Sequence, residues 1–192
     1  MTIDVGTGDG RAVLAAAARE PRTLVIGLDA DAASMAEASR RVARAARAAG
    51  TGGWPNALFV AAAVEAMPDE LAGLASLVTV RFPWAGLLRG VLGRDALVVA
   101  GIASVLAPGG VVELLLAPAA RDRLAELPTE PSDIEAAVAG GFEPHGLRVV
   151  EARTASTDEI RASHSTWAKR LLGGSQHRGE PSDRAVILVR LR

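Results

Sequence analysis

A glycine-rich segment near the start of the chain has the composition of a loop that holds a nucleotide-like cofactor. Its sequence, DVGTGDG, spans residues 4–10, follows a short apolar stretch and precedes an alanine-rich one. Glycine at alternate positions permits a tight turn with positive φ and lets backbone amides approach a ligand closely. A helix beginning here would also offer the ligand its electropositive N-terminus. We therefore expect Gly6, Thr7 and Gly8 to line a cofactor site.

Two acids, one at the start of this loop and one after the next apolar run, form a pattern that favours S-adenosylmethionine. Asp29 closes the next apolar run, 25 residues after Asp4. A carboxylate there would accept hydrogen bonds from both ribose hydroxyls of an adenosine-type cofactor, and Ala30 beside it is included in the predicted site. Asp4 can hold the cationic ammonium of a methionine moiety, which nicotinamide cofactors lack. The G-x-G-x-G spacing and the PGG turn at residues 108–110 point the same way, and an ordinary glycine turn capped by Asp9 is the alternative.

Ala63 and Glu65 extend the predicted cofactor site. They lie just past the third apolar run, where a side chain or the backbone could read the exocyclic amine of the cofactor's adenine. The alternative for Glu65 is a solvated acid at the start of a helical turn.

Two tryptophans stand in segments that could bind a flat substrate. The fourth apolar run ends in VRFPW at residues 80–84, where Pro83 interrupts the strand and Trp84 presents a large ring. Trp167 lies in the segment HSTWAKRL at residues 164–171. An indole provides a stacking surface for a base, whereas ordinary core packing is the alternative for both.

The elements that must position these residues alternate between strands and helices. We predict strands at residues 2–5, 23–28, 56–61, 77–82, 111–116, 147–152 and 185–191, and helices at 11–19, 31–49, 95–106 and 157–172. This alternation predicts a mostly parallel sheet with helices on both faces, which binds its ligand at the carboxyl ends of the strands. No linker divides the chain, so we expect a single domain over residues 1–192.

Composition excludes several classes of protein and site. The net charge of −1 excludes a histone-like basic protein, and the absence of cysteine excludes a disulfide framework and a thiolate zinc site. Three histidines leave little room for a histidine-built centre, so we expect no metal. The longest weakly polar run is interrupted by the PGG turn and the N-terminus lacks an export signal, so we expect a cytoplasmic protein.

The arginines are distributed unevenly enough to suggest where RNA could bind. Arg40, Arg41, Arg44 and Arg47 fall mostly on one face of the helix predicted at residues 31–49, with no acid between the first and the last. The tail from residue 145 carries nine Lys or Arg and five Asp or Glu, and it includes Arg178. Such patches could neutralise phosphates, although a solvated helix face is the alternative.

Five segments together resemble a known family, the small-subunit ribosomal RNA adenine-N1 methyltransferases of the Kam type that confer aminoglycoside resistance. The segments span most of the chain in family order. They are DVGTGDGR (4–11), VIGLDA (25–30), NALFVAAAVEAMP (56–68), VTVRFPWAGLLRGVLG (78–93) and HSTWAKRL (164–171).

The resemblance implies a fold, a cofactor, a partner and residue roles. The fold would be α/β, a Rossmann-like class I S-adenosylmethionine-dependent methyltransferase with a seven-stranded, mostly parallel sheet, an antiparallel last strand and helices on both faces. Trp84 and Trp167 would sandwich a target adenine flipped out of the decoding-site helix of the small (30S) ribosomal subunit. Ser165 would position the tail segment, and Arg170 would support RNA binding or the framework of the active site. Pro83 is included among the residues expected to contact RNA. The remaining matched residues would hold S-adenosylmethionine: Asp4, Gly6, Gly8, Asp29 and Glu65. We expect such an enzyme to act as a monomer.

One departure from the family leaves two other functions open. In the family a short β-hairpin precedes the glycine loop, which here begins at residue 4. Because that hairpin would help to form the RNA-docking surface, we expect cofactor binding to be retained better than RNA binding. The alternatives are a small-molecule methyltransferase on the same fold and a cofactor-binding but inactive paralogue.

Overall fold

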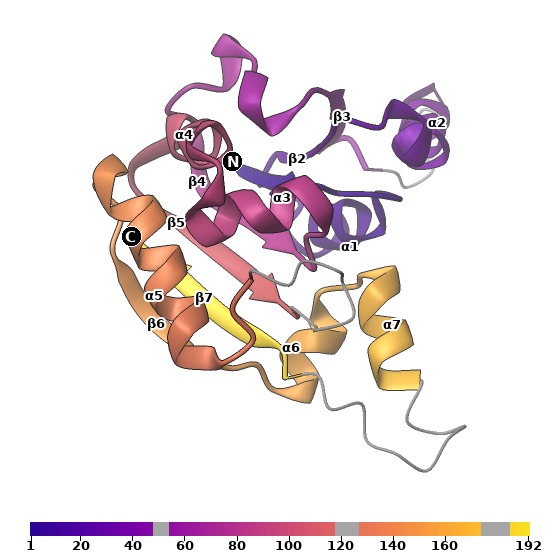
Figure 1. Cartoon of the computed structure of the whole chain (residues 1–192). Coiled ribbons are helices and arrows are strands. Elements are labelled where there is room, and N and C mark those ends of the chain that lie inside the picture. The colour runs from indigo at the N-terminus through magenta and orange to yellow at the C-terminus, as the bar shows by residue number, and fades with distance from the viewer. Residues whose placement is uncertain (48–53, 118–126, 174–184) are drawn as a thin grey trace.

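The computed structural model describes residues 1–47, 54–117, 127–173 and 185–192, and its centre is a seven-stranded sheet (Figure 1). The strand order is β3-β2-β1-β4-β5-β7-β6. The strands are β1 (Thr2–Val5), β2 (Val25–Asp29), β3 (Ala57–Ala61), β4 (Ala75–Arg81), β5 (Leu106–Leu116), β6 (Val149–Thr154) and β7 (Ile187–Leu191). The pairs among β1 to β5 are parallel, whereas β7 runs antiparallel to both β5 and β6. The predicted mostly parallel sheet with an antiparallel last strand is therefore confirmed.

Helices cover both faces of this sheet. They are α1 (Arg11–Arg19), α2 (Ala32–Arg47), α3 (Ala85–Arg89), α4 (Ala96–Ser104), α5 (Pro131–Phe142), α6 (Thr157–Ala162) and α7 (Thr166–Gly173). Short helical turns are η1 (Val64–Ala66), η2 (Asp69–Leu71), η3 (Gly90–Arg94) and η5 (Glu143–His145). Figure 1 shows α3, α4 and α5 over one face, with α6 and α7 near the carboxyl end of β5. No helix in these described ranges is both long and apolar enough to cross a bilayer.

Three clusters of buried side chains hold the layers together. The largest joins the sheet to α3, α4 and α5 and includes Val80, Ile102 and Phe142. A second packs α1 and α2 against β2 and β3, and a third packs α6 and α7 against the ends of β5 and β7. Each face of the central strands is therefore covered by apolar side chains, as a sheet with parallel strands requires.

The sequence prediction missed α5 altogether. This helix begins with Pro131 at its first turn, and it buries Ile134, Val138 and Phe142 completely. These three residues are spaced four apart, which places them on one face of a helix, and this spacing could have identified it.

The helix predicted over residues 157–172 is in fact two helices, which corrects that prediction. Ser156 and Glu159 form a reciprocal capping box that begins α6, and the chain then breaks at residues 163–165 before α7. His164 adopts a left-handed backbone conformation with φ of 53°, which a continuous helix does not allow. The strand predicted at 111–116 also begins earlier, at Leu106, and the helix before it ends at Ser104.

Candidate active site

The glycine loop connects the carboxyl end of β1 to α1 and lies across the end of β2. Gly6, Gly8 and Gly10 have φ values of 70°, 57° and 72°, so the loop depends on glycine as the sequence predicts. The amides of Gly6 and Thr7 both donate to the carbonyl of Leu28, at 2.8 and 3.1 Å. A Cβ on Gly6 would lie 2.6 Å from Leu87 Cδ2, whereas a Cβ on Gly8 would meet no atom within 4 Å. Gly8 thus faces open space beside the loop.

Asp29 holds this loop in place at the end of β2. Its Oδ2 accepts the backbone N–H of Gly8 at 2.8 Å, and its Oδ1 accepts that of Asp31 at 2.9 Å. Each carboxylate oxygen has a further lone-pair direction, so the side chain can accept two more hydrogen bonds from a ligand. That capacity matches a ribose with two adjacent hydroxyls.

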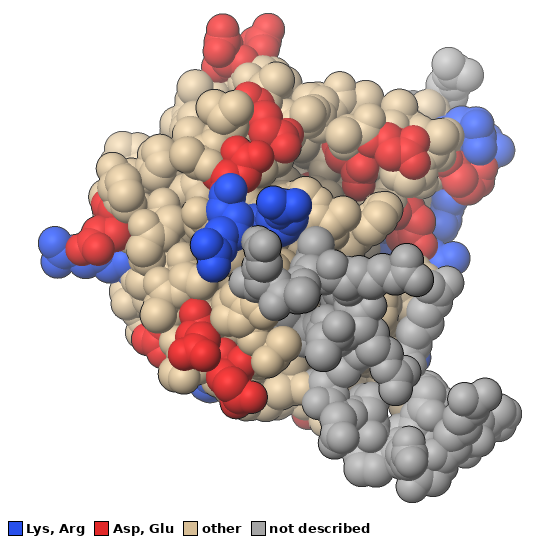
Figure 2. All heavy atoms as spheres, viewed as in Figure 1, with Lys and Arg blue, Asp and Glu red and all other residues tan. Residues whose placement is uncertain are grey.

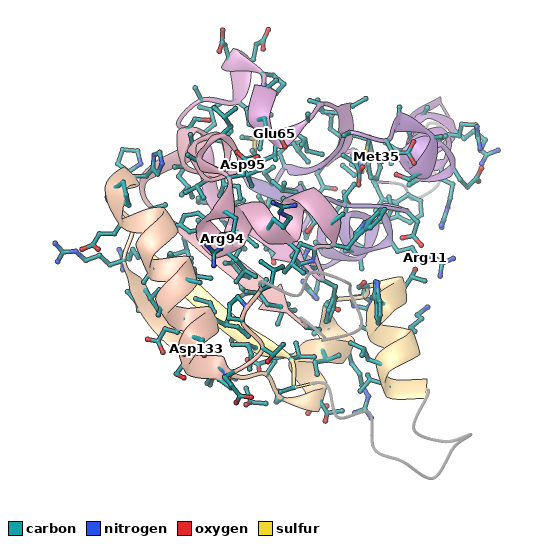
Figure 3. The ribbon with its side chains drawn as sticks, in the orientation of Figure 1. Arg11, Met35, Glu65, Arg94, Asp95 and Asp133 are labelled. Carbon is teal, nitrogen blue, oxygen red and sulfur yellow. The ribbon has the colours of Figure 1, made fainter. Side chains whose placement is uncertain are left out.

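A cavity of about 220 Å³ lies beside these residues, at the carboxyl ends of β1, β2, β3 and β4. Its lining includes these predicted cofactor residues: Gly6, Gly8, Asp29, Ala30, Ala63 and Glu65. Glu65 belongs to η1, the turn that follows β3, and is labelled in Figure 3. Apolar side chains such as Val5 and Leu28 complete the lining and would pack against a purine. The donor and acceptor set and the apolar wall therefore fit the adenosine of S-adenosylmethionine.

A second cavity, of about 270 Å³, adjoins the first and is lined by the remaining residues predicted to bind the cofactor or the target base. The two share Gly6, Gly8, Phe82 and Trp84 in their linings. The second is also lined by Asp4, Thr7, Asp9, Arg81, Ser165, Thr166 and Trp167. Residues from the N-terminal loop, the end of β4 and the start of α7 thus meet at one site, although they lie far apart in the sequence.

Asp4 is almost fully buried at the wall of the second cavity. It is 4% exposed, and its Oδ1 accepts from Thr79 Oγ1 at 2.6 Å and from Arg81 Nη1. Its Oδ2 accepts from Thr7 Oγ1 at 2.9 Å. The carboxylate is therefore already paired with a cation, a partner that the sequence prediction did not include.

The two predicted tryptophans are exposed at this site, so core packing does not account for either. Trp84 is 77% exposed and Trp167 is 38% exposed. Trp84 lies between Phe82 and Ala85, which have φ values of 51° and 47°, and His164 is left-handed just before α7. Non-glycine residues rarely adopt such angles, and strained residues of this kind gather at functional sites. Both segments that carry a tryptophan are therefore held in unusual backbone conformations.

Ser165 and Thr166 fix the start of α7. Ser165 Oγ accepts the backbone N–H of Trp167 at 3.1 Å, in the manner of a helix N-cap. Thr166 Oγ1 donates to Asp9 Oδ2 at 2.7 Å, which ties the helix bearing Trp167 to the glycine loop. Asp9 also forms an ion pair with Arg11, which Figure 3 shows near α7. Ser165 thus caps α7 at the turn before Trp167, and its role in positioning the tail segment stays a prediction.

The predicted arginine face on α2 is partly neutralised. Glu37, one turn earlier, forms ion pairs with Arg40 at 3.0 Å and with Arg44 at 2.9 Å. The hydrogen bond from Arg40 holds the pKa of Glu37 below its ordinary value, so this acid is charged at neutral pH. Arg41 stacks over Trp54, 4.9 Å from the ring centroid. Acidic and basic groups are correspondingly interspersed over α2 in Figure 2.

Of four other residues of the predicted RNA surface, only Pro83 has a described side chain. Pro83 lines the first cavity beside Trp84. The side chains of Arg47 and Arg170 lie outside the described residues, and so does the whole of Arg178.

Sequence reasoning missed Arg81 and Gly101. Arg81 is the residue immediately before FPW, and its position at the end of a predicted strand was a usable signal, although its proximity to Asp4 is set by the pairing of β1 with β4. Gly101 lies in α4, where an added Cβ would be 1.9 Å from the carbonyl oxygen of Val64. A glycine within a helix signals close packing, here against the turn that carries Glu65.

Comparison with known proteins gives consistent matches over nearly the whole chain. A family model described as NpmA, 16S rRNA (adenine(1408)-N(1))-methyltransferase, matches residues 1–182. A curated protein of that same description from Streptoalloteichus tenebrarius is 35% identical over 178 residues, which cover 89% of this chain and 80% of that protein. One from Streptoalloteichus hindustanus is 33% identical over 177 residues, with the same coverage of both chains.

Solved structures of similar proteins are also methyltransferases of this kind. The aminoglycoside resistance methyltransferase NpmB1 is 36% identical, with a TM-score of 0.75 over 99% of this chain and 85% of its own. A tryptophan-to-alanine variant of the 16S rRNA (adenine(1408)-N(1))-methyltransferase from Catenulisporales acidiphilia, solved with its cosubstrate S-adenosylmethionine, is 29% identical. Its TM-score is 0.81 over 99% of this chain and 84% of its own.

Proposed function

The chain belongs to the NpmA family of 16S rRNA (adenine(1408)-N(1))-methyltransferases, and from this premise we propose that it methylates N1 of that adenine in the small ribosomal subunit. The observation that carries the proposal is the meeting of two exposed tryptophans beside the cavity bounded by the glycine loop and Asp29. A cofactor cavity next to two indole rings suits transfer of a methyl group to a flipped-out base.

The residues of the first cavity would hold S-adenosylmethionine, which supplies an electrophilic methyl group on its sulfonium when bound. Asp29 would accept hydrogen bonds from the ribose hydroxyls with the lone pairs that Gly8 and Asp31 leave unused. Ala63 and Glu65 would lie along the adenine. Asp4 and Thr7 line the second cavity, on the side of the loop where the methionine end would extend.

Trp84 and Trp167 would hold the target adenine by stacking. Adenine N1 carries an in-plane lone pair in the neutral base, so no side chain has to remove a proton before the transfer. The task of the protein is then alignment of N1 with the methyl group, together with indole faces that tolerate the cationic product.

The wider setting follows from this activity. The proposed partner is the small (30S) ribosomal subunit with its 16S rRNA, and the enzyme would act on it as a monomer in the cytoplasm. Methylation at this base would protect the host against aminoglycosides, as the names of the structural relatives indicate.

The direct test is methylation of purified 30S subunits with labelled S-adenosylmethionine, followed by primer extension to locate the modified base. We expect one new stop at the target adenine. Trp84→Ala and Trp167→Ala should each lower transfer roughly 5- to 150-fold, the effect of losing about 1–3 kcal/mol of base stacking. Cofactor affinity measured by calorimetry should change little, and Trp84→Phe should retain more activity than Trp84→Ala.

Trp54→Phe is the matched control, because Trp54 contacts Arg41 and lines neither cavity. Label at another base would contradict the proposed target site, and undiminished transfer in both alanine variants would contradict the proposed stacking role of the two tryptophans. Transfer to a small molecule alone would instead support a small-molecule methyltransferase, and cofactor binding without any transfer would support an inactive paralogue. A rise in resistance to kanamycin and apramycin on expression in bacteria would support the proposed function in cells.

A further inference from the structure

Arg81 is the residue at this site whose purpose the proposed function leaves unexplained. It is the last residue of β4, and Thr79, two residues earlier, lies directly opposite Asp4 of β1. Residues two apart on a strand face the same side of the sheet, so Thr79 and Arg81 both point to the side of Asp4. The ion pair between Arg81 Nη1 and Asp4 Oδ1 follows from this register.

The guanidinium of Arg81 has donors to spare. Within the described part of the chain, Asp4 is its hydrogen-bonding partner and engages Nη1 alone, which leaves Nε and Nη2 available. The side chain is 17% exposed, and it lines the 270 Å³ cavity together with Asp4. A planar guanidinium presents paired N–H groups that match a carboxylate.

The charge balance of the cavity shows what those donors could bind. Its described lining contains two carboxylates, Asp4 and Asp9, and one cation, Arg81. An amino-acid group carries both an ammonium and a carboxylate, and beside Asp4 and Asp9 its carboxylate would be repelled unless a cation faces it. Arg81 is placed to supply that cation while Asp4 faces the ammonium.

We propose that Asp4 and Arg81 act as a pair that recognises the zwitterionic amino-acid end of S-adenosylmethionine, with Arg81 binding its carboxylate. The inference rests on the proposed function and deepens it, because it assigns a specificity-determining residue to the methionine end of the cofactor. Arg81 thereby has two roles, as the counter-ion that keeps Asp4 in place and as the anion-binding group of the second cavity.

The test compares two ligands on purified full-length variants by calorimetry. The ligands are S-adenosylmethionine and its decarboxylated form, which keeps the adenosine, the sulfonium and the ammonium but lacks the carboxylate. Wild type should bind S-adenosylmethionine more tightly. Arg81→Gln, which keeps a hydrogen-bond donor near Asp4, should shrink that preference by roughly 10- to 100-fold, the effect of one charge-assisted hydrogen bond. Arg81→Lys should restore part of the preference.

The ratio of the two affinities distinguishes recognition from structural damage, because a disturbed fold weakens both ligands alike. Arg19→Gln is the matched control, since Arg19 lines a neighbouring cavity with Arg81 but not the one that holds Asp4. An unchanged ratio in Arg81→Gln and Arg81→Lys, or a wild type that does not discriminate between the ligands, overturns the inference and leaves the methyltransferase proposal intact. A wild type that binds neither ligand overturns the proposed function and this inference with it.

Discussion

At the scale of single residues, Asp29 combines a structural and a binding task in one side chain. Its carboxylate holds the amides of Gly8 and Asp31, and it also faces the 220 Å³ cavity. We expect Asp29→Ala to weaken S-adenosylmethionine binding at least 10- to 100-fold, because hydrogen bonds to a charged acceptor contribute about 1.5–3 kcal/mol each. Calorimetric titration measures this directly.

Asp31→Asn provides the control for that substitution. Asp31 lies two residues away, does not line the cavity, and accepts the backbone N–H of Ala33 through Oδ1, which asparagine can also do. Its cofactor affinity should stay within about threefold of wild type, a change of less than 1 kcal/mol. Equal losses in both variants would indicate a general effect of acidic charge rather than contact with the ribose.

At the scale of elements, the bond between Thr166 and Asp9 couples α7 to the glycine loop. Thr166→Val removes the hydroxyl but keeps the shape of the side chain, so Trp167 loses one restraint on its position. We expect 30S methylation to fall about fivefold, as the loss of about 1 kcal/mol of hydrogen bonding would cause, while cofactor affinity stays unchanged. Thr157→Val, at the exposed start of α6, is the control. A loss of cofactor affinity without a loss of transfer would contradict this coupling.

The contact of α4 with η1 depends on a single glycine. A Cβ on Gly101 would lie 1.9 Å from the carbonyl oxygen of Val64, so Gly101→Ala must push apart the helix and the turn that carries Glu65. We expect a loss of about 1–3 kcal/mol in the free energy of unfolding and weaker cofactor binding.

Gly140→Ala is the matched control for that experiment. Gly140 lies in α5, is exposed, and its added Cβ would meet no atom within 4 Å. Since glycine within a helix costs up to about 1 kcal/mol relative to alanine, this substitution should stabilise the protein slightly. Denaturant unfolding of both variants, with cofactor titration alongside, measures the contrast. Equal stability of the two variants would show that α4 does not need glycine.

At the scale of the whole molecule, a chain of ion pairs joins the second half of the sheet to α6. Arg190 contacts Glu113 and Glu151, and Arg153 contacts Glu151 and Glu159. Hydrogen bonds from Arg153 hold the pKa values of Glu159 and Glu151 below the ordinary glutamate value of 4.5. Their stabilising contribution is therefore complete above that value, and it is lost as the pH falls from there through the lowered pKa values of the folded state.

This chain of ion pairs leads to a pH-dependent prediction. The melting temperature of wild type should fall as the pH drops below about 4.5. Arg153→Gln should show a smaller fall, because without Arg153 the pKa values of Glu151 and Glu159 are lowered less in the folded state. Arg161→Gln removes only the exposed pair with Asp158 and serves as control. An equal fall in melting temperature for wild type and Arg153→Gln across this pH range would contradict the role of Arg153 in lowering the pKa values of these glutamates.

The sequence was sufficient to predict the parts of the molecule that depend on local patterns. Alternating apolar runs predicted all seven strands, and the glycines predicted a loop whose φ values are positive. The sequence was not sufficient where the pairing of distant segments determines which side chains meet. The partner of Asp4 is set by the register of β1 against β4, and Glu37 changes the charge of the α2 face from one turn outside the arginine cluster. Phe82, Ala85 and His164 have left-handed backbone conformations, yet none is a glycine or asparagine, the residues that usually adopt them. Tertiary contacts must therefore impose these conformations.

The distribution of aromatic residues also makes the protein its own spectroscopic probe. The chain has three tryptophans and no tyrosine, so its near-ultraviolet fluorescence comes from indole alone. Two of these emitters stand exposed at the candidate site, and the third stacks under Arg41. Removing Trp54 would therefore leave a protein whose emission reports only on the site. Its quenching during rapid mixing with ribosomal subunits would time the arrival of the adenine separately from the transfer that follows.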